Sequence, residues 1–83
     1  MLFFDFSSGK YFMKDENILT KQLKELEERS QKGEKLLWND YYHTIGLPSM
    51  AFGKQPMARK EYGNVIDFEL FPSEDCTVIY VNR

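Results

Sequence analysis

Few side chains in this sequence have the types and spacing that chemistry requires. His43 is the single histidine, and its conceivable partners in a metal site are Asp40 and Cys76. One histidine, one cysteine and scattered carboxylates show no metal-ligand spacing, and nothing in the sequence places an activating base beside Cys76. We expect His43 at a helix surface or boundary and Cys76 as a small side chain at the start of a strand.

Asp67 and Glu69 form a second candidate, because they lie two residues apart on one face of a predicted strand, with Glu61 upstream. Paired carboxylates can perform acid–base catalysis or bind a divalent cation. Two acids on the solvated face of an amphipathic strand need neither role, and we favour that interpretation. The sequence also contains no phosphate-binding glycine loop, nucleophile elbow or zinc signature. It therefore predicts a protein that is not an enzyme and that uses no metal or cofactor.

Aromatic side chains are the more informative set, at 16% of the 83 residues. Helix geometry places Trp38 and Tyr42 on one side of a short helix, and Tyr41 beside Ile45 on a neighbouring side. Not all of these rings fit inside so small a domain, and Tyr and Trp are frequent anchors of interfaces. Core packing is the alternative for each ring singly. We predict a partner-binding set that comprises Trp38, Tyr41, Tyr42, Phe52 and Tyr62.

A long amphipathic helix from about Asp15 to Lys32 is the clearest element that could position these side chains. Its apolar residues recur with the 3.6-residue period, as Leu19, Leu23 and Leu26. Asp15 or Asn17 can cap its start, and Gly33 suits its left-handed end.

An earlier start of this helix, near Ser8, also fits the pattern, because Phe12 lies on the same stripe. A second, shorter helix is indicated by residues 39–46, where Asn39 is a favoured N-cap and Gly46 can end the helix. Residues 54–64 show no hydrophobic periodicity and contain glycine, proline and several charged residues, which is typical of a loop.

The C-terminal part predicts a β-hairpin, with alternating residues at 64–71, a turn at 72–75 and a second strand at 76–81. Residues 2–6 also have the composition of a strand. The predicted fold class is therefore α+β: one long N-terminal amphipathic helix, one short helix and a C-terminal antiparallel β-hairpin, extended to three strands if residues 2–6 join it. Residues 1–83 are expected to form a single small domain.

Charge and hydropathy restrict the partners. Eleven Lys and Arg stand against thirteen Asp and Glu, for a net charge of −2. Because DNA binding relies on clustered positive charge, nucleic acid is a disfavoured partner. Lys54, Arg59 and Lys60 could form a local basic patch, although a solvated basic loop is the favoured interpretation. No apolar run approaches the roughly 20 residues that span a bilayer, so we expect no membrane association.

One alternative comes from the order of the elements, which is also that of a winged helix-turn-helix, a DNA-binding regulator. The recognition helix of such a protein would here span about Ser49 to Arg59. Gly53 and Pro56 would break that helix after one turn.

The middle of the chain resembles a family of short phage and mobile-element proteins of Gram-positive bacteria. The resemblance rests on the run W-N-D-Y-Y-H-T-I-G-L-P at residues 38–48, with a charged helix before it and a late hairpin after it. Such proteins often have Gly-Trp after the second glycine, whereas Lys54-Gln55-Pro56 follows Gly53 here. The resemblance implies a small α+β domain of mobile-element origin and carries over no catalytic residue.

We therefore predict a non-enzymatic phage or mobile-element protein that acts by protein–protein contact. It would be a virion-associated or accessory component, or an inhibitor of a host defence protein. The expected partner is a phage or host protein or, in a homodimer, a second copy of this chain. The expected location is the cytoplasm of the host cell or the virion.

Overall fold

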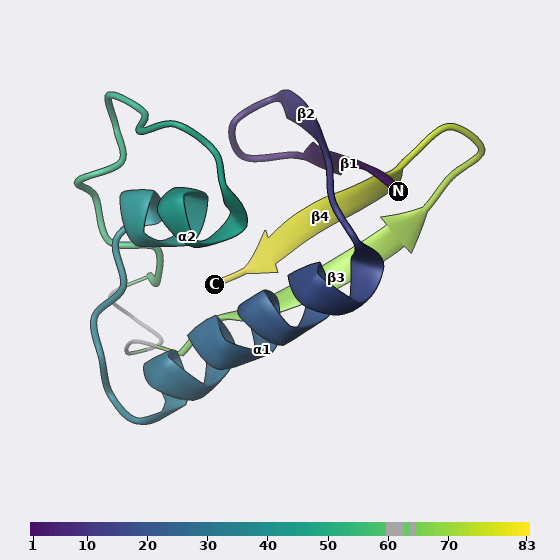
Figure 1. Ribbon diagram of the computed structural model, residues 1–83. Coiled ribbons are helices and arrows are strands. Elements are labelled where there is room, and N and C mark those ends of the chain that lie inside the picture. Colours follow the sequence, from purple (N-terminus) through teal and green to yellow (C-terminus); the bar gives the residue numbers. More distant parts are fainter. Residues whose placement is uncertain (60–62, 64) are drawn as a thin grey trace.

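The computed structural model describes residues 1–59, 63 and 65–83. Its elements, in chain order, are β1 (Leu2–Asp5), β2 (Lys10–Met13), α1 (Glu16–Gln31), α2 (Trp38–Ile45), β3 (Asp67–Pro72) and β4 (Thr77–Asn82) (Figure 1). The described strands form a mixed sheet in the order β2-β1-β4-β3, in which β1 runs parallel to β4 and the other neighbours are antiparallel. The fold is α+β.

The expected architecture, a hairpin with at most one additional strand, is wrong, because the sheet has a fourth strand. The strand that the sequence does not predict is β2, and it occupies residues that the alternative, earlier start of the long helix would include. Phe12 is instead the cross-strand partner of Phe3, with ring centroids 5.7 Å apart. Gly9, at φ +72°, closes the turn between the two strands, and its N–H donates to the Asp5 carbonyl at 2.8 Å.

The long helix forms as the periodicity predicts. Asp15 is its N-cap, and the Asp15 carboxylate accepts hydrogen bonds from the backbone N–H groups of residues 17 and 18. Gly33 follows the C-cap with φ +92°, the left-handed conformation expected there. The predicted apolar stripe is buried, as Leu19, Leu23 and Leu26.

The N-cap of the short helix lies two residues before Asn39, which is the predicted N-cap. Leu37 occupies that position, and its N–H donates to the side chain of Asp40 at 2.8 Å. Gly46, at φ +92°, ends the helix as expected. The ammonium group of Lys14 donates to the carbonyl of Ile45 at 2.7 Å, which places a cation at the negative end of the helix.

Asn39 organises the segment that follows α2. Its side-chain oxygen accepts from the N–H of Met50, and its own N–H donates to the carbonyl of Gly53, both at 2.9 Å. A Cβ atom at Gly53 would lie 1.8 Å from that oxygen, so glycine is required by close approach. Residues 49–59 form turns and bends rather than a helix, which leaves the winged-helix alternative without its recognition helix.

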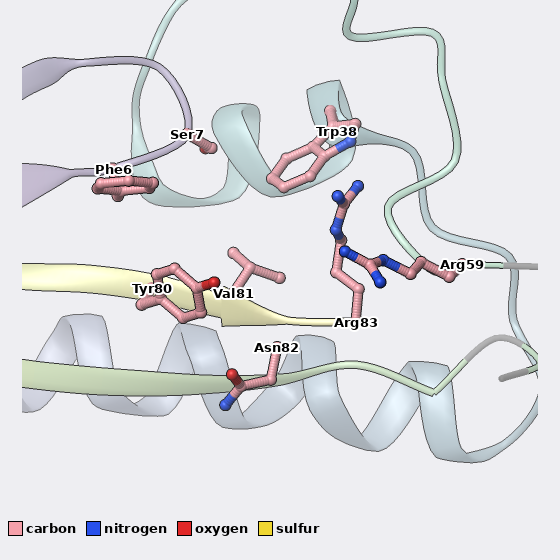
Figure 2. A pocket seen from close by; sticks show the side chains of 8 residues that line it. All are labelled: Phe6, Ser7, Trp38, Arg59, Tyr80, Val81, Asn82 and Arg83. Carbon is pink, nitrogen blue, oxygen red and sulfur yellow. The ribbon is translucent and has the colours of Figure 1, made fainter.

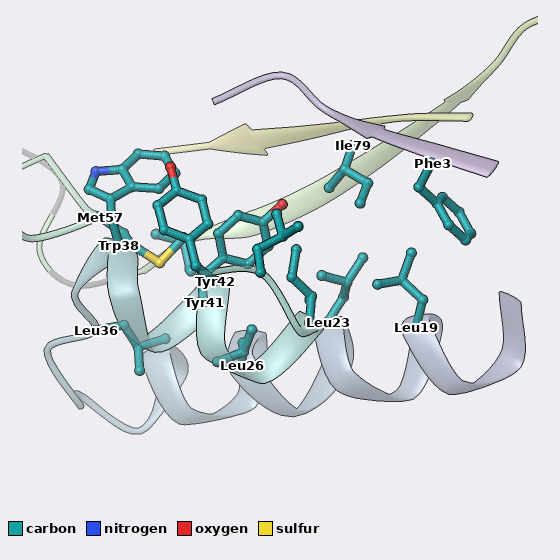
Figure 3. Close-up of a cluster of buried hydrophobic side chains, with 13 residues drawn as sticks. Phe3, Leu19, Leu23, Leu26, Leu36, Trp38, Tyr41, Tyr42, Met57 and Ile79 are labelled. Atoms are coloured by element: carbon teal, nitrogen blue, oxygen red, sulfur yellow. The ribbon is translucent and has the colours of Figure 1, made fainter. Parts of the chain in front are cut away.

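The two helices pack against one face of the sheet and enclose the core. Figure 3 shows the α1 leucines directed at Ile79 of β4 and Phe3 of β1, with the rings of α2 completing the cluster. At the β3 edge, the N–H of Phe68 donates to the Glu27 carboxylate at 2.8 Å, so a side chain of α1 satisfies an otherwise free edge donor. Ile66 is also buried, as the predicted alternation requires.

The contact between Gly53 and Asn39 can be tested by a double-mutant cycle. Gly53→Ala should lower the free energy of unfolding by about 1–3 kcal/mol, because the new methyl group displaces the Asn39 amide from Met50. In an Asn39→Ala background the same substitution should cost less than about 0.5 kcal/mol. Urea unfolding of the four proteins measures both values, and equal costs in the two backgrounds would contradict this role of Asn39.

Candidate functional site

The aromatic set predicted to bind a partner contributes mainly to the core. Tyr41 and Tyr42 are fully buried and Trp38 is 8% exposed, and their ring centroids lie between 5.3 and 6.2 Å apart. Phe52 meets Trp38 edge-on and is 41% exposed. Tyr62 lies outside the described residues. Among the described members, Phe52 is thus the one with a widely exposed ring.

A buried carboxylate connects these rings to the sheet. Asp5 on β1 is fully buried, and its side chain accepts hydrogen bonds from the Tyr41 hydroxyl at 2.6 Å, the Ser8 N–H at 2.9 Å and the Ser7 hydroxyl at 2.9 Å. The Tyr42 hydroxyl lies 3.0 Å from Ser7 Oγ. Because Ser7 directs its one hydroxyl hydrogen at the carboxylate, Tyr42 is the donor in this pair. Asp5 and Ser7 thereby hold both tyrosines of α2 against the β1–β2 turn.

Burial raises the pKa of the Tyr41 phenol far above its ordinary value, and the charge of Asp5 and the hydrogen bond to it raise this pKa further. Burial also raises the pKa of Tyr42, and the charge of Asp5 adds to that shift. Tyr41 in particular stays a protonated donor well into the alkaline range. This network is a structural support, and its closed surroundings give a substrate no access to Asp5.

The helix-free face of the sheet, here called the outer face, is mostly apolar. Strand alternation places side chains from all four strands on it, and one row across the sheet runs from Tyr11 through Phe4 and Val78 to Phe71. The apolar residues of the outer face are Leu2, Phe4, Phe6, Tyr11, Met13, Phe71, Val78 and Tyr80.

Aromatic contacts make the outer face continuous. Ring centroids lie 4.7 Å apart in Phe4–Tyr11 and 5.6 Å apart in Phe6–Tyr80, and Tyr80 also meets Phe71 at 6.4 Å. Phe6, Tyr11, Met13, Phe71 and Tyr80 are each between 41% and 71% exposed. Soluble monomers rarely leave so many neighbouring large apolar side chains in water, and such patches mark interaction sites.

A cleft of about 390 Å³ opens beside the outer face, where the end of β4 approaches α2. Phe6 and Tyr80 belong to both the outer face and the cleft wall, and Trp38 closes the far side (Figure 2). The guanidinium carbon of Arg83 lies 5.4 Å from the centroid of the Trp38 ring, in a cation–π contact. The described residues that line the cleft are Phe6, Ser7, Trp38, Arg59, Tyr80, Val81, Asn82 and Arg83.

The titratable candidates from the sequence lie apart from this cleft. His43 is at the surface of α2, with Nε2 2.6 Å from Ser49 Oγ, and Cys76 is half-buried immediately before β4. Asp67 and Glu69 are exposed on the outer side of β3, and Glu69 accepts from the Asn82 amide at 2.5 Å. In the described part of the chain, no three His, Cys, Asp or Glu side chains gather closely enough to hold a metal ion.

The predicted basic patch and the acidic residue upstream of Asp67 lie partly or wholly outside the described residues. Lys54 and Arg59 are exposed, and Arg59 reaches the cleft, whereas Lys60 and Glu61 lie outside the described residues.

None of the described helices has the length and hydropathy of a membrane span.

Sequence reasoning missed three features: the role of Asp5, the outer face and the approach of Arg59 to Arg83. Asp5 had a signal, because a lone acid inside an apolar strand and before Ser-Ser-Gly is typical of a turn carboxylate. The outer face could be predicted only from the pairing register of all four strands, and the sequence does not predict β2 as a strand. Arg59 and Arg83 lie 24 residues apart in sequence, and no local pattern relates them.

Comparison with known proteins found no similarity: no family model matches this chain, and neither a curated protein nor a solved structure matches it. The resemblance to phage and mobile-element proteins therefore stays a prediction.

The raised pKa of Tyr41 predicts a specific loss of stability in alkali. Above about pH 10 the tyrosine of the unfolded chain ionises while the buried one does not, so ionisation stabilises the unfolded state and lowers the free energy of unfolding. Each pH unit beyond that point should cost about 1.4 kcal/mol for this group. Tyr41→Phe should be less stable at pH 7, by about 1.5–3 kcal/mol, and should lose stability less steeply above pH 10. Urea unfolding between pH 8 and 11 measures both effects, and parallel pH profiles would refute this role.

Proposed function

We propose that this chain is a non-enzymatic protein of a phage or mobile element that acts by binding another protein through its outer face. The observation that carries the proposal is the exposure of contiguous large apolar side chains over four strands, from Tyr11 at one edge to Phe71 at the other. The location that fits this function is the host cytoplasm or the virion.

The chemistry of the outer face supports a protein as its partner. Aromatic rings supply large contact area with few rotatable bonds, and methionine adds an apolar side chain that adapts to its surroundings. Tyr80 and Tyr11 add hydroxyl groups that can form hydrogen bonds at a rim. Asp67 and Glu69 lie beside the apolar part on β3 and add a negative border. Complementary charge on a partner at this border would fix its orientation.

The opposite side of the domain is a weaker candidate. Its helices bury their apolar stripes against the core and leave charged side chains outward, with Ile18 the exposed large apolar residue of α1. Ile18 is 53% exposed, which is comparable to the residues of the outer face. It therefore offers a matched control for substitutions there.

Photo-crosslinking in Gram-positive host cells, with phage proteins present, tests the proposal. A benzophenone amino acid at position 11 or 71 should capture the same protein, whereas one at position 18 should not. The double variant Tyr11→Ser, Phe71→Ser should lose at least about nine-tenths of the complex, because it removes two ring contacts that are each worth roughly 1–2 kcal/mol. Its free energy of unfolding should change by less than about 1 kcal/mol, since both side chains are exposed.

Ile18→Ser is the control, and it should leave the complex unchanged. Equal capture at positions 11 and 18, or no capture at 11 and 71, would argue against the outer face. If the captured protein is a second copy of this chain, sedimentation should show a dimer that the double variant converts to monomer and that Ile18→Ser preserves.

A further inference from the structure

The cleft beside the outer face exists because β4 is longer than the strand that pairs with it. Pairing of β1 with β4 ends at Asp5 opposite Ile79, and β4 continues to Asn82. The N–H of Phe6 donates to the Ile79 carbonyl at 3.2 Å, and the chain then turns away towards Gly9. The last residues of β4 therefore have β3 on one side and the cleft on the other.

Val81 presents its backbone to this cleft. In a strand, alternate residues direct their N–H and C=O to the same side, so Val81 directs them to the side that Ile79 uses for β1. In the part of the chain that the structure describes, no strand pairs with Val81 on that side. One free donor and one free acceptor at a strand edge form a template for an extended peptide.

Among the described lining residues, two arginines carry charge into the cleft. Figure 2 shows Arg83 rising from the end of β4 towards Trp38, and Arg59 entering from the opposite loop. None of the described lining residues is acidic, and neither arginine forms an ion pair with another described residue; the described ion pair is Arg29–Glu34. Two guanidinium groups in one cleft attract a carboxylate or phosphate oxygen, which arginine binds in a bidentate manner.

We propose that the cleft binds an extended acidic peptide segment of the protein partner. The main chain of that segment pairs with Val81, and its carboxylate lies between Arg59 and Arg83. The volume, about 390 Å³, is within the range of ligand sites and suits a few residues. This inference rests on the proposed function, because Phe6 and Tyr80 continue from the cleft into the outer face and one partner would cover both. The carboxylate comes from an acidic side chain or from a C-terminus.

Trp38 makes the test direct, because it is the only tryptophan and it lines the cleft. Four probes are titrated against the full chain, with tryptophan fluorescence and the amide NMR signals as readouts. They are a blocked tetrapeptide with one central glutamate, the same peptide with glutamine, a tetrapeptide whose single acid is its C-terminus, and inorganic phosphate. We expect one acidic peptide to bind about tenfold or more tightly than the glutamine peptide and to shift the Val81 amide signal.

Arginine variants test whether the carboxylate of the peptide lies between Arg59 and Arg83. Arg83→Gln and Arg59→Gln should each weaken the acidic peptide by about tenfold, whereas Lys21→Gln, an exposed cation on α1, should not. Binding of phosphate alone, binding without a shift of Val81, or equal binding by all variants would overturn the inference. If the crosslinks at positions 11 and 71 persist unchanged in the arginine variants, the cleft is excluded from the complex and the proposed function stands without it.

Discussion

The rest of the structure depends on the burial of one carboxylate, that of Asp5. An acid inside a core is strongly destabilising unless hydrogen bonds replace its water. Here the Tyr41 hydroxyl and donors from residues 7 and 8 provide that replacement. Because those donors come from α2 and from the β1–β2 turn, satisfying the charge requires both elements to lie in one arrangement. The same bonds keep Tyr41 and Tyr42 inside, where their area contributes to a core that an 83-residue chain can barely provide.

This constraint also determines which surfaces remain available to a partner. Asp5 belongs to the helix side of β1, so its neighbours Phe4 and Phe6 are directed to the other side by strand alternation. The turn that closes over the carboxylate ends the pairing of β1 early, and β4 continues past it. The apolar outer face and the arginine cleft are therefore two consequences of one packing arrangement. Burying either surface would require another helix or strand, and the described part of the chain contains none that does so.

The elements that could be predicted from the sequence are those whose signals are local. The α1 stripe of Leu19, Leu23 and Leu26 repeats over several turns, and the alternation around Ile66 extends over a whole strand. β2 was missed because four residues are too few to distinguish a strand from a helix, and Phe12 satisfied both periods. The sequence predicts Asn39 as an N-cap, because no local pattern shows that its amide oxygen accepts from the N–H of Met50, eleven residues away. Composition and helix geometry predict that the rings of residues 38–42 lie close together, but they do not tell which rings are buried.

By itself, the sequence determined the α+β class, the long helix and its caps, and the alternation of the last hairpin, because each follows from side chains within a few residues of one another. Only the tertiary structure decided that β1 pairs in parallel with β4, that Asp5 is buried, and that Arg59 and Arg83 enter one cleft. These facts depend on contacts between residues far apart in the chain, which are selected by the total burial and hydrogen bonding of the fold. Local periodicity shows which face of an element is apolar, whereas the element that packs against that face depends on the packing of the whole fold.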